Sequence, residues 1–260
     1  MRLLLFIPSL MGGGAERVAA NLANHWAARG WAVTIATLAA RATDAYELDA
    51  RVERISLGLD DERRGPLRDV GKNVARVHAL RRVLQHVAPD VALSLTSVAN
   101  VILALAKSGL RVCAIGSEHT HPPCAPLGLL REALRRATYG RLAAVVALTA
   151  ESAQWLQTST SARTVPVIPN PVAWPLPSRA HAIAPVASRS HERRLLLTVG
   201  RLSAEKNLPA LFAAFARVAQ RHDDWDVVVL GEGPDRAALA AEIDALGLRG
   251  RVALPGRVAD

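Results

Sequence analysis

Short apolar runs alternate along this chain with longer segments in which apolar residues recur at helical spacing. Residues 3–7 are continuously apolar, which is typical of a strand buried on both faces. After a glycine cluster, the spacing of Val18, Leu22 and Trp26 predicts a helix that ends at Gly30. The same pattern predicts further strands at residues 33–38, 52–57, 91–95, 111–115, 143–148, 165–168, 195–199, 227–230 and 252–254. It predicts further helices at residues 74–87, 97–107, 127–139, 208–221 and 235–246.

Strands that alternate with helices predict an α/β fold with parallel sheets and right-handed connections. Residues 58–71 are charged and contain Gly and Pro, so we expect a loop there. Residues 171–194 break the alternation, because they combine four prolines with scattered polar residues and show no periodicity. We therefore expect an N-terminal α/β domain over residues 1–170, a proline-rich linker over 171–194, and a second α/β domain over 195–260.

The composition excludes several classes of protein. The chain has 260 residues, half of them hydrophobic, which is enough to bury a large core and excludes a disordered chain. Two cysteines cannot build a disulfide scaffold. The longest uncharged stretch, residues 91–106, contains polar side chains and is shorter than the ~20 residues of a membrane span. We therefore expect a cytoplasmic protein, with at most a peripheral contact at the inner face of the membrane.

The net charge of +9 is unevenly distributed along the chain. Residues 1–150 carry 19 basic and 12 acidic side chains, whereas residues 151–260 carry 13 and 11. The first part is therefore the better candidate to contact an anionic partner. Nucleic acid is disfavoured as that partner, because no nucleic-acid motif is present and aromatic residues, at 4%, are too few for a stacking platform.

Ligands of parallel α/β sheets bind at the carboxyl ends of strands, so the loops that follow strands are the places to look for chemistry. The first such loop holds Gly12, Gly13 and Gly14 before a helix, where backbone amides and the helix N-terminus favour an anion. A dinucleotide fingerprint is disfavoured, because Arg17 stands at its third glycine position. The alternative is a tight turn without a ligand.

A second loop of this kind begins with Gly200 and carries Arg201 and Lys206. Arginine makes bidentate contacts to phosphate and lysine supplies a point charge, so the two cations can converge on a diphosphate. The alternative is a pair of solvated surface charges. Gly231 and Gly256 lie in the next two loops, where glycine lets the backbone pass close to a ligand.

Together these loops resemble the motifs of one family. The matching segments, in chain order, are GGGAER at residues 12–17, IPNPV at 168–172, VGRLSAEKN at 199–207, GEGP at 231–234 and LPG at 254–256. Their order and spacing resemble those of the family-4 retaining glycosyltransferases, and the resemblance spans nearly the whole chain. The chain departs from the family pattern at Pro171, where glycine is usual after the asparagine.

The resemblance implies the GT-B fold, with two Rossmann-like domains of which the second is incomplete here. It implies transfer of a sugar from a nucleotide-sugar, expected to be UDP-linked, to a lipid-linked or polysaccharide acceptor in surface polysaccharide biosynthesis, with retention of configuration. Arg201 and Lys206 would hold the donor diphosphate with Gly200, Gly231 and Gly256 beside them. No metal or other cofactor is implied, because two fixed cations replace the ion.

The same resemblance assigns roles in the first domain. Gly13, Gly14 and Glu16 would form a loop that meets the phosphate or the acceptor. Glu118 and His119, which follow the strand predicted at residues 111–115, are the candidate catalytic residues, with His119 approaching the donor sugar. Two alternatives stay open for this segment. One is a capped polar loop, and the other is a zinc site that would draw on the following residues: Cys113, His119, His121 and Cys124.

The helix predicted at residues 127–139 is amphipathic and basic. Its apolar side consists of Leu129, Leu130, Ala133, Leu134 and Ala137. Its remaining surface is dominated by Arg131, Arg135 and Arg136, with Arg141 following. Such a helix can rest on anionic lipid headgroups. The alternative is a helix that packs its apolar side on the core and exposes its arginines to solvent.

The acidic motif that follows in the family, two glutamates separated by seven residues, has no match before Asp260. The chain is therefore expected to cover the N-terminal two thirds of such an enzyme and to be unstable or inactive alone, because a half-built sheet leaves an open edge. A nucleotide-sugar epimerase of the same fold and a non-catalytic nucleotide-binding remnant are the alternative functions.

Overall fold

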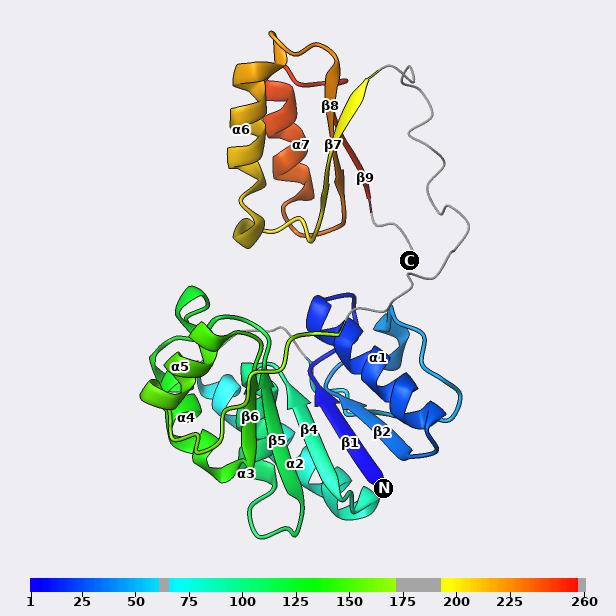
Figure 1. Ribbon diagram of the computed structural model, residues 1–260, viewed down its shortest axis with the longest axis vertical. Coiled ribbons are helices and arrows are strands. Elements are labelled where there is room, and N and C mark those ends of the chain that lie inside the picture. The colour runs from blue at the N-terminus through cyan, green and yellow to red at the C-terminus, as the bar shows by residue number, and fades with distance from the viewer. Residues whose placement is uncertain (61–65, 172–192, 257–260) are drawn as a thin grey trace. The chain divides into compact units, whose positions relative to one another are not determined.

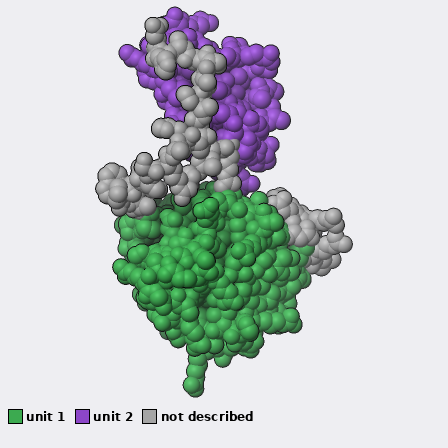
Figure 2. Space-filling view, turned by 90° about the vertical axis from the view of Figure 1, so that its right-hand side faces the viewer, with its two compact units in different colours: residues 1–172 green, residues 173–260 purple. Residues whose placement is uncertain are grey.

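The computed structural model describes residues 1–60, 66–171 and 193–256. The chain divides into two compact units, Met1–Val172 and Ala173–Asp260, which Figure 2 shows in different colours. Each unit is described below by itself. Of the linker expected at residues 171–194, residues 172–192 lie outside the described part of the chain.

The first unit is a parallel sheet of six strands in the order β3-β2-β1-β4-β5-β6 (Figure 1). Its strands are β1 (Arg2–Ile7), β2 (Ala32–Thr37), β3 (Glu53–Ser56), β4 (Val91–Leu95), β5 (Cys113–Glu118) and β6 (Ala144–Ala147). Its helices are α1 (Gly14–Ala28), α2 (Pro66–Val87), α3 (Ser97–Ala106), α4 (Leu129–Thr138) and α5 (Ala150–Ser159). The strand order reverses between β1 and β4, which is the switch point where such sheets bind ligands.

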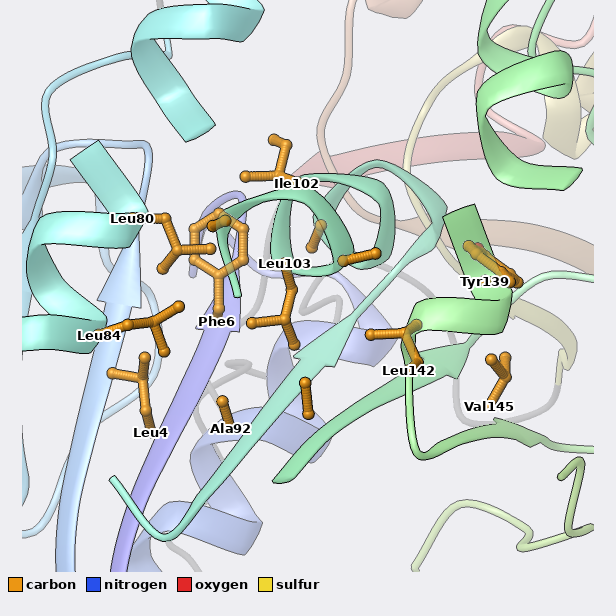
Figure 3. Packing of buried hydrophobic residues seen from close by; sticks show 14 of the residues in the cluster. Leu4, Phe6, Leu80, Leu84, Ala92, Ile102, Leu103, Tyr139, Leu142 and Val145 are labelled. Carbon is orange, nitrogen blue, oxygen red and sulfur yellow. The ribbon is translucent and has the colours of Figure 1, made fainter. Parts of the chain in front are cut away.

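Strand β1 forms the centre of this unit because both of its faces are buried. Leu3, Leu5 and Ile7 pack with α1 on one face, in a cluster that includes Val18 and Ala23. Leu4 and Phe6 point to the opposite face, where they meet Leu80 and Leu84 of α2 and Leu103 of α3 (Figure 3). This alternation explains why the strand is continuously apolar in the sequence.

The second unit is a parallel sheet of three strands in the order β7-β8-β9. Its elements are β7 (Arg194–Val199), α6 (Leu208–Ala219), β8 (Trp225–Leu230), α7 (Arg236–Ala245) and β9 (Val252–Gly256). Both helices lie on the same face of the sheet (Figure 1), where Phe212, Phe215 and Ile243 pack with Val227 and Val229 of β8.

The structure corrects four of the expected elements and adds a fifth that was not expected. Helix α2 begins at Pro66, inside the segment 58–71 that was expected to be a loop. Residues 165–168 form no strand, since only an isolated bridge joins Val167 to Ala147. Strand β9 was expected to end at residue 254 but continues through Gly256. Strand β5 was expected at residues 111–115 but runs from Cys113 to Glu118. Helix α5 was missed, although the Thr149 side chain caps it by accepting a 3.2 Å hydrogen bond from the Ser152 amide.

Candidate functional site

A pocket of about 380 Å³ lies in the first unit, at the carboxyl ends of β1, β4 and β5. Its lining residues are Ile7, Pro8, Gly13, Gly14, Ala15, Glu16, Thr96, His119, Thr120 and Asn170. The pocket therefore occupies the switch point of the sheet, between the loops that follow β1 and β4. It gathers three predicted segments that are far apart in the sequence: the glycine loop, the His119 segment and the IPNPV segment.

The glycine loop is organised around Glu16. The Gly12 amide donates a 2.7 Å hydrogen bond to Glu16 Oε2, and the Gly13 amide donates a shorter one to the same oxygen. The Ser9 hydroxyl donates to Glu16 Oε1. In this structure the Glu16 carboxylate therefore accepts from the Gly13 amide as part of the cap of α1, and contact of Gly13 with a phosphate or the acceptor stays a prediction. Gly14 opens α1 and lines the pocket, as does Glu16.

Thr96 is a pocket residue that the sequence pattern did not single out. It follows β4 directly and has a φ of 88°, which is an uncommon and strained value for a β-branched residue. Its amide donates to the Ser117 carbonyl at 3.0 Å, which ties β4 to β5 at their ends. Its Oγ1 is buried and has no hydrogen-bond partner among the described residues. In the sequence, the position of Thr96 directly after a predicted strand could have pointed to it as a pocket residue.

His119 lines the same pocket and is half-buried. Its Nε2 lies 3.1 Å from Ser117 Oγ, and its Nδ1 is buried without a partner among the described residues. Burial lowers the pKa of His119 below its ordinary value of 6.5, because the charged imidazolium is less well solvated there. At neutral pH the side chain is therefore a neutral imidazole.

Glu118 lies in the interior of the unit and does not line the pocket. It is the last residue of β5, so the strand does not end at residue 115 as expected. Its carboxyl accepts hydrogen bonds from the Tyr139 hydroxyl and, at 2.7 Å, from Ser97 Oγ. Burial raises the pKa of Glu118, and the hydrogen bonds from Tyr139 and Ser97 oppose that rise. These hydrogen bonds join Glu118 at the end of β5 to Tyr139 and Ser97, and its catalytic role stays a prediction.

The zinc alternative fails on geometry. Cys113 begins β5 and His119 follows its end, so the two residues are separated by the length of the strand, about 20 Å at ~3.3 Å per residue. His121 instead has its Nδ1 3.0 Å from Ser152 Oγ and its Nε2 3.5 Å from a carboxylate oxygen of Glu151. Within the described ranges, no group of three or more His, Cys, Asp or Glu side chains is placed to hold a metal ion.

In the second unit, the three predicted glycine loops meet at the carboxyl ends of the strands. The Gly200 amide donates to the Leu230 carbonyl at 2.9 Å, and the Gly231 amide donates to the Gly256 carbonyl at 2.8 Å. A Cβ atom on Gly231 would lie 1.8 Å from the Gly200 carbonyl oxygen, so only glycine fits there. Packing between the loops thus explains this glycine, and its contact with a ligand remains a prediction.

Arg201 and Lys206 lie exposed on the loop after β7. The Lys206 stem passes Gly200, because a Cβ atom built on that glycine would lie 3.6 Å from Lys206 Cε. The pKa of Glu205 is lowered first by a hydrogen bond from the Ser203 hydroxyl and further by the charges of Arg201 and Lys206. Both cations therefore influence the Glu205 carboxylate, and their convergence on a diphosphate stays a prediction.

Helix α4 departs from the packed alternative at its first two leucines and at Arg135, whereas Arg131 and Arg136 are exposed as that alternative expects. Leu129 is 95% exposed and Leu130 is 66% exposed, whereas Arg135 is 1% exposed. The Arg135 guanidinium lies over the Trp155 ring, 4.7 Å from its centroid, and pairs with Glu132. Leucines and arginines such as Arg131 therefore share one exposed surface. None of the helices in the described parts of the chain is long and apolar enough to cross a membrane.

Two family profiles match the chain, and together they follow the two units. Residues 12–173 match the family described as Glycosyltransferase Family 4, and residues 182–260 match Glycosyl transferases group 1. An alpha-D-kanosaminyltransferase from Streptomyces kanamyceticus is 40% identical over 65 residues, which is 25% of this chain and 17% of that protein. The match thus spans about a sixth of the relative's length.

Solved structures share the fold at low sequence identity. Sucrose-phosphate synthase from Thermosynechococcus elongatus has a TM-score of 0.79 at 16% identity, covering all of this chain and 71% of that one. The lipopolysaccharide glycosyltransferase WaaG has a TM-score of 0.74 at 16% identity, covering 99% of this chain and 70% of that one. Anabaena HepE in complex with UDP-glucose has a TM-score of 0.65 at 18% identity, covering 100% of this chain and 70% of that one.

These likenesses confirm the expected α/β fold of the GT-B type, in which the second unit has three strands in its described part. The family profiles confirm that the loop motifs indicated a glycosyltransferase, whereas retention of configuration stays a prediction. Because the first of them extends over more than half of its residues, this chain belongs to the glycosyltransferases of Glycosyltransferase Family 4.

Proposed function

We propose that this chain carries the donor-binding loops and the acceptor-side pocket of a glycosyltransferase that uses a nucleotide-sugar. The observation that carries the proposal is the meeting of the Gly200, Gly231 and Gly256 loops beside Arg201 and Lys206. A solved neighbour, HepE, is described in complex with UDP-glucose, which supports a UDP-linked donor. Transfer with retention, to a polysaccharide or lipid-linked acceptor, is the part of the proposal that rests on the resemblance alone.

The two cations have a direct chemical role in this proposal. Transfer of the sugar leaves negative charge on the departing nucleoside diphosphate, and fixed positive groups stabilise that charge without reorganisation. The Arg201 guanidinium can bind two phosphate oxygens at once, while the Lys206 ammonium adds a point charge. The proposal needs no divalent metal ion, because these side chains supply the positive charge.

Calorimetric titration of UDP into the 260-residue chain tests this assignment. We expect R201A and K206A each to weaken UDP binding at least about tenfold, since a charge-assisted hydrogen bond contributes about 1.5–3 kcal/mol. R217A, which removes an exposed arginine of α6, is the matched control for R201A and should bind as the parent does. A chelator such as EDTA should leave the affinity unchanged. Unchanged affinity in both loop variants would refute the assignment.

We further propose that α4 rests on an anionic membrane surface. Exposed leucines at the start of the helix can enter the headgroup region, and the exposed Arg131 and Arg136 can meet lipid phosphates. Vesicles that contain phosphatidylglycerol should bind the chain, and vesicles of phosphatidylcholine alone should bind it less. The double variant L129D/L130D should lose this binding, whereas L246D, at an exposed leucine of the second unit, should keep it. Equal binding of both variants would contradict the proposal.

A further inference from the structure

Asn100 is a buried polar residue that the candidate site does not include. It lies in α3, a helix whose other buried residues are all apolar, and its own side chain is fully covered. A buried carboxamide lowers stability unless its donors and acceptors are paired within the protein. The hydrogen-bond partners of Asn100 therefore indicate what the residue does.

The Asn100 carboxamide pairs with both backbone groups of Ser117, a residue of β5. Its Nδ2 donates to the Ser117 carbonyl at 3.1 Å, and its Oδ1 accepts from the Ser117 amide at 3.2 Å. Nδ2 also donates to the Tyr139 hydroxyl at 3.3 Å, and Oδ1 accepts from Ser94 Oγ at 2.7 Å. The side chain is therefore well paired, and half of its pairing holds one residue of β5.

Gly116, the residue before Ser117, makes room for this carboxamide. A Cβ atom on Gly116 would lie 3.0 Å from Asn100 Cγ and 2.9 Å from Leu142 Cδ1, which is closer than side chains normally pack. The φ of Gly116 is not in the left-handed region, so its backbone conformation does not require glycine. A glycine inside a strand weakens the strand and often marks a close approach. The sequence of β5 thus accommodates Asn100 directly beside Ser117.

Ser117 in turn contacts the two pocket residues that follow β4 and β5. Its carbonyl accepts a 3.0 Å hydrogen bond from the Thr96 amide, and its Oγ lies 3.1 Å from Nε2 of His119. Thr96 and His119 both line the pocket, whereas Asn100 and Ser117 do not. The Asn100 side chain can therefore act on the pocket through Ser117.

We propose that Asn100 is a positioning residue of this pocket: its carboxamide fixes Ser117, and Ser117 fixes the orientation of the His119 imidazole. The inference rests on the proposed function, because it gives this imidazole a defined place in the site of sugar transfer. Position matters there, since a displacement of about 1 Å in an active site can lower the rate on the order of 100-fold.

NMR of the 260-residue chain, labelled with ¹⁵N in its histidine rings, tests this proposal. The pH is held at about 8, where an imidazole is neutral. The variant H119N identifies the His119 signals among those of eight histidines. We expect S117A to shift these signals, because it removes the hydroxyl beside Nε2, and N100A to shift them in the same direction. The double variant N100A/S117A should match S117A, because Asn100 acts through Ser117.

A matched control separates positioning from a general loss of stability. L103A removes a fully buried leucine from the same helix, so it should destabilise the unit and leave the His119 signals in place. G116A displaces Asn100 without removing it and should shift the signals as N100A does, which keeps the test decisive if N100A fails to fold.

Two results would overturn the proposal. One is that L103A shifts the His119 signals as far as N100A does. The other is that S117A, or both N100A and G116A, leave these signals where the parent chain has them. Neither result depends on UDP binding or on sugar transfer, so the proposed function stands or fails separately.

Discussion

Strands β1 and β7 begin the two units in the same way but have different surroundings. Both are parallel strands that are followed by a glycine-containing loop and a helix, and both pair with the next strand along the chain. Strand β1 also pairs with β4 on its other side, and residues 3–7 are fully covered. Strand β7 lies at the edge of its sheet in the described part of the chain, and four of its residues, Leu195, Leu196, Leu197 and Val199, are 40–73% exposed.

The difference shows that an apolar run in the sequence predicts a strand but does not fix its burial. Residues 3–7 and 195–199 have nearly the same pattern, yet among the residues that the structure describes only the first run has partners on both edges and both faces. Positions on β1 should therefore matter far more for stability than positions on β7, whereas β7 should govern association. The predictions below test this contrast, from the largest expected effect to the smallest.

Truncation of the β1 core should destabilise the first unit strongly. F6A removes a fully buried ring between α2 and α3, and such a cavity costs about 3–5 kcal/mol. The comparison variant L197A removes a side chain that is 53% exposed, and its cost should stay below about 1 kcal/mol. Urea unfolding followed by circular dichroism measures both values. Equal losses for the two variants would contradict the contrast between the strands.

The second unit should depend on a buried carboxylate at the other end of its sheet. Asp226 is 2% exposed, and its carboxylate pairs with both Arg193 and Arg251 at 3.1 Å. D226A leaves two partly exposed guanidinium groups without this partner, so we expect a loss of about 2 kcal/mol. D224A removes an exposed partner of Arg194 and should change the unfolding free energy by less than about 0.5 kcal/mol. A D226A loss no larger than that of D224A would show that the buried pair does not stabilise the unit.

Charge on β7 should change association without changing stability. Exposed apolar edge strands pair with other chains, and a lysine on the edge prevents this. We expect the 260-residue chain to self-associate with rising concentration in sedimentation velocity experiments, and L197K to reduce that association. L246K carries the same change at another exposed leucine and should associate as the parent does. If L197K and the parent chain sediment in the same way, association does not take place through β7.

The pH dependence of stability should carry a small contribution from His119. Burial lowers its folded-state pKa below 6.5, so the unfolded state binds the proton more readily. The contribution is therefore fully present above pH 6.5 and is lost as the pH falls through the folded-state pKa. H119N cannot take up this proton, and its unfolding free energy should fall less between pH 7 and pH 5. Parallel pH profiles of parent and variant would assign the titration to other groups.

Much of the fold could be predicted from the sequence, because alternating periodicities reflect burial directly. The strands and helices around Gly200, Gly231 and Gly256 illustrate this, since their loops meet at one end of the second sheet. Helix α2 was placed too short because its first turns contain charged residues and a glycine, which give no apolar stripe. Helix α5 was missed because its apolar positions are few and its start depends on the Thr149 cap.

The sequence predicted where the residues of the candidate site lie along the chain. It predicted less well which side chains contact one another. His119 directly follows β5 and Glu16 lies in the first turn of α1, and both line one pocket. Glu118 is adjacent to His119 in sequence, but alternation along β5 directs it into the interior, where Tyr139 and Ser97 bind it. The engagement of the Gly13 amide by Glu16 follows the three-residue spacing of a capping box, but it could be assigned only once the start of α1 was known.

The central claim is that Arg201 and Lys206 hold the donor diphosphate. Its most direct test is an NMR titration with UDP of the 260-residue chain labelled with ¹⁵N at its glycines. If the loops of the second unit hold the donor, UDP shifts the Gly200, Gly231 and Gly256 signals, and the double variant R201A/K206A abolishes these shifts while its spectrum stays folded. If UDP leaves the three loop signals unmoved, or moves them equally in the double variant, the assignment of Arg201 and Lys206 to the donor diphosphate is wrong.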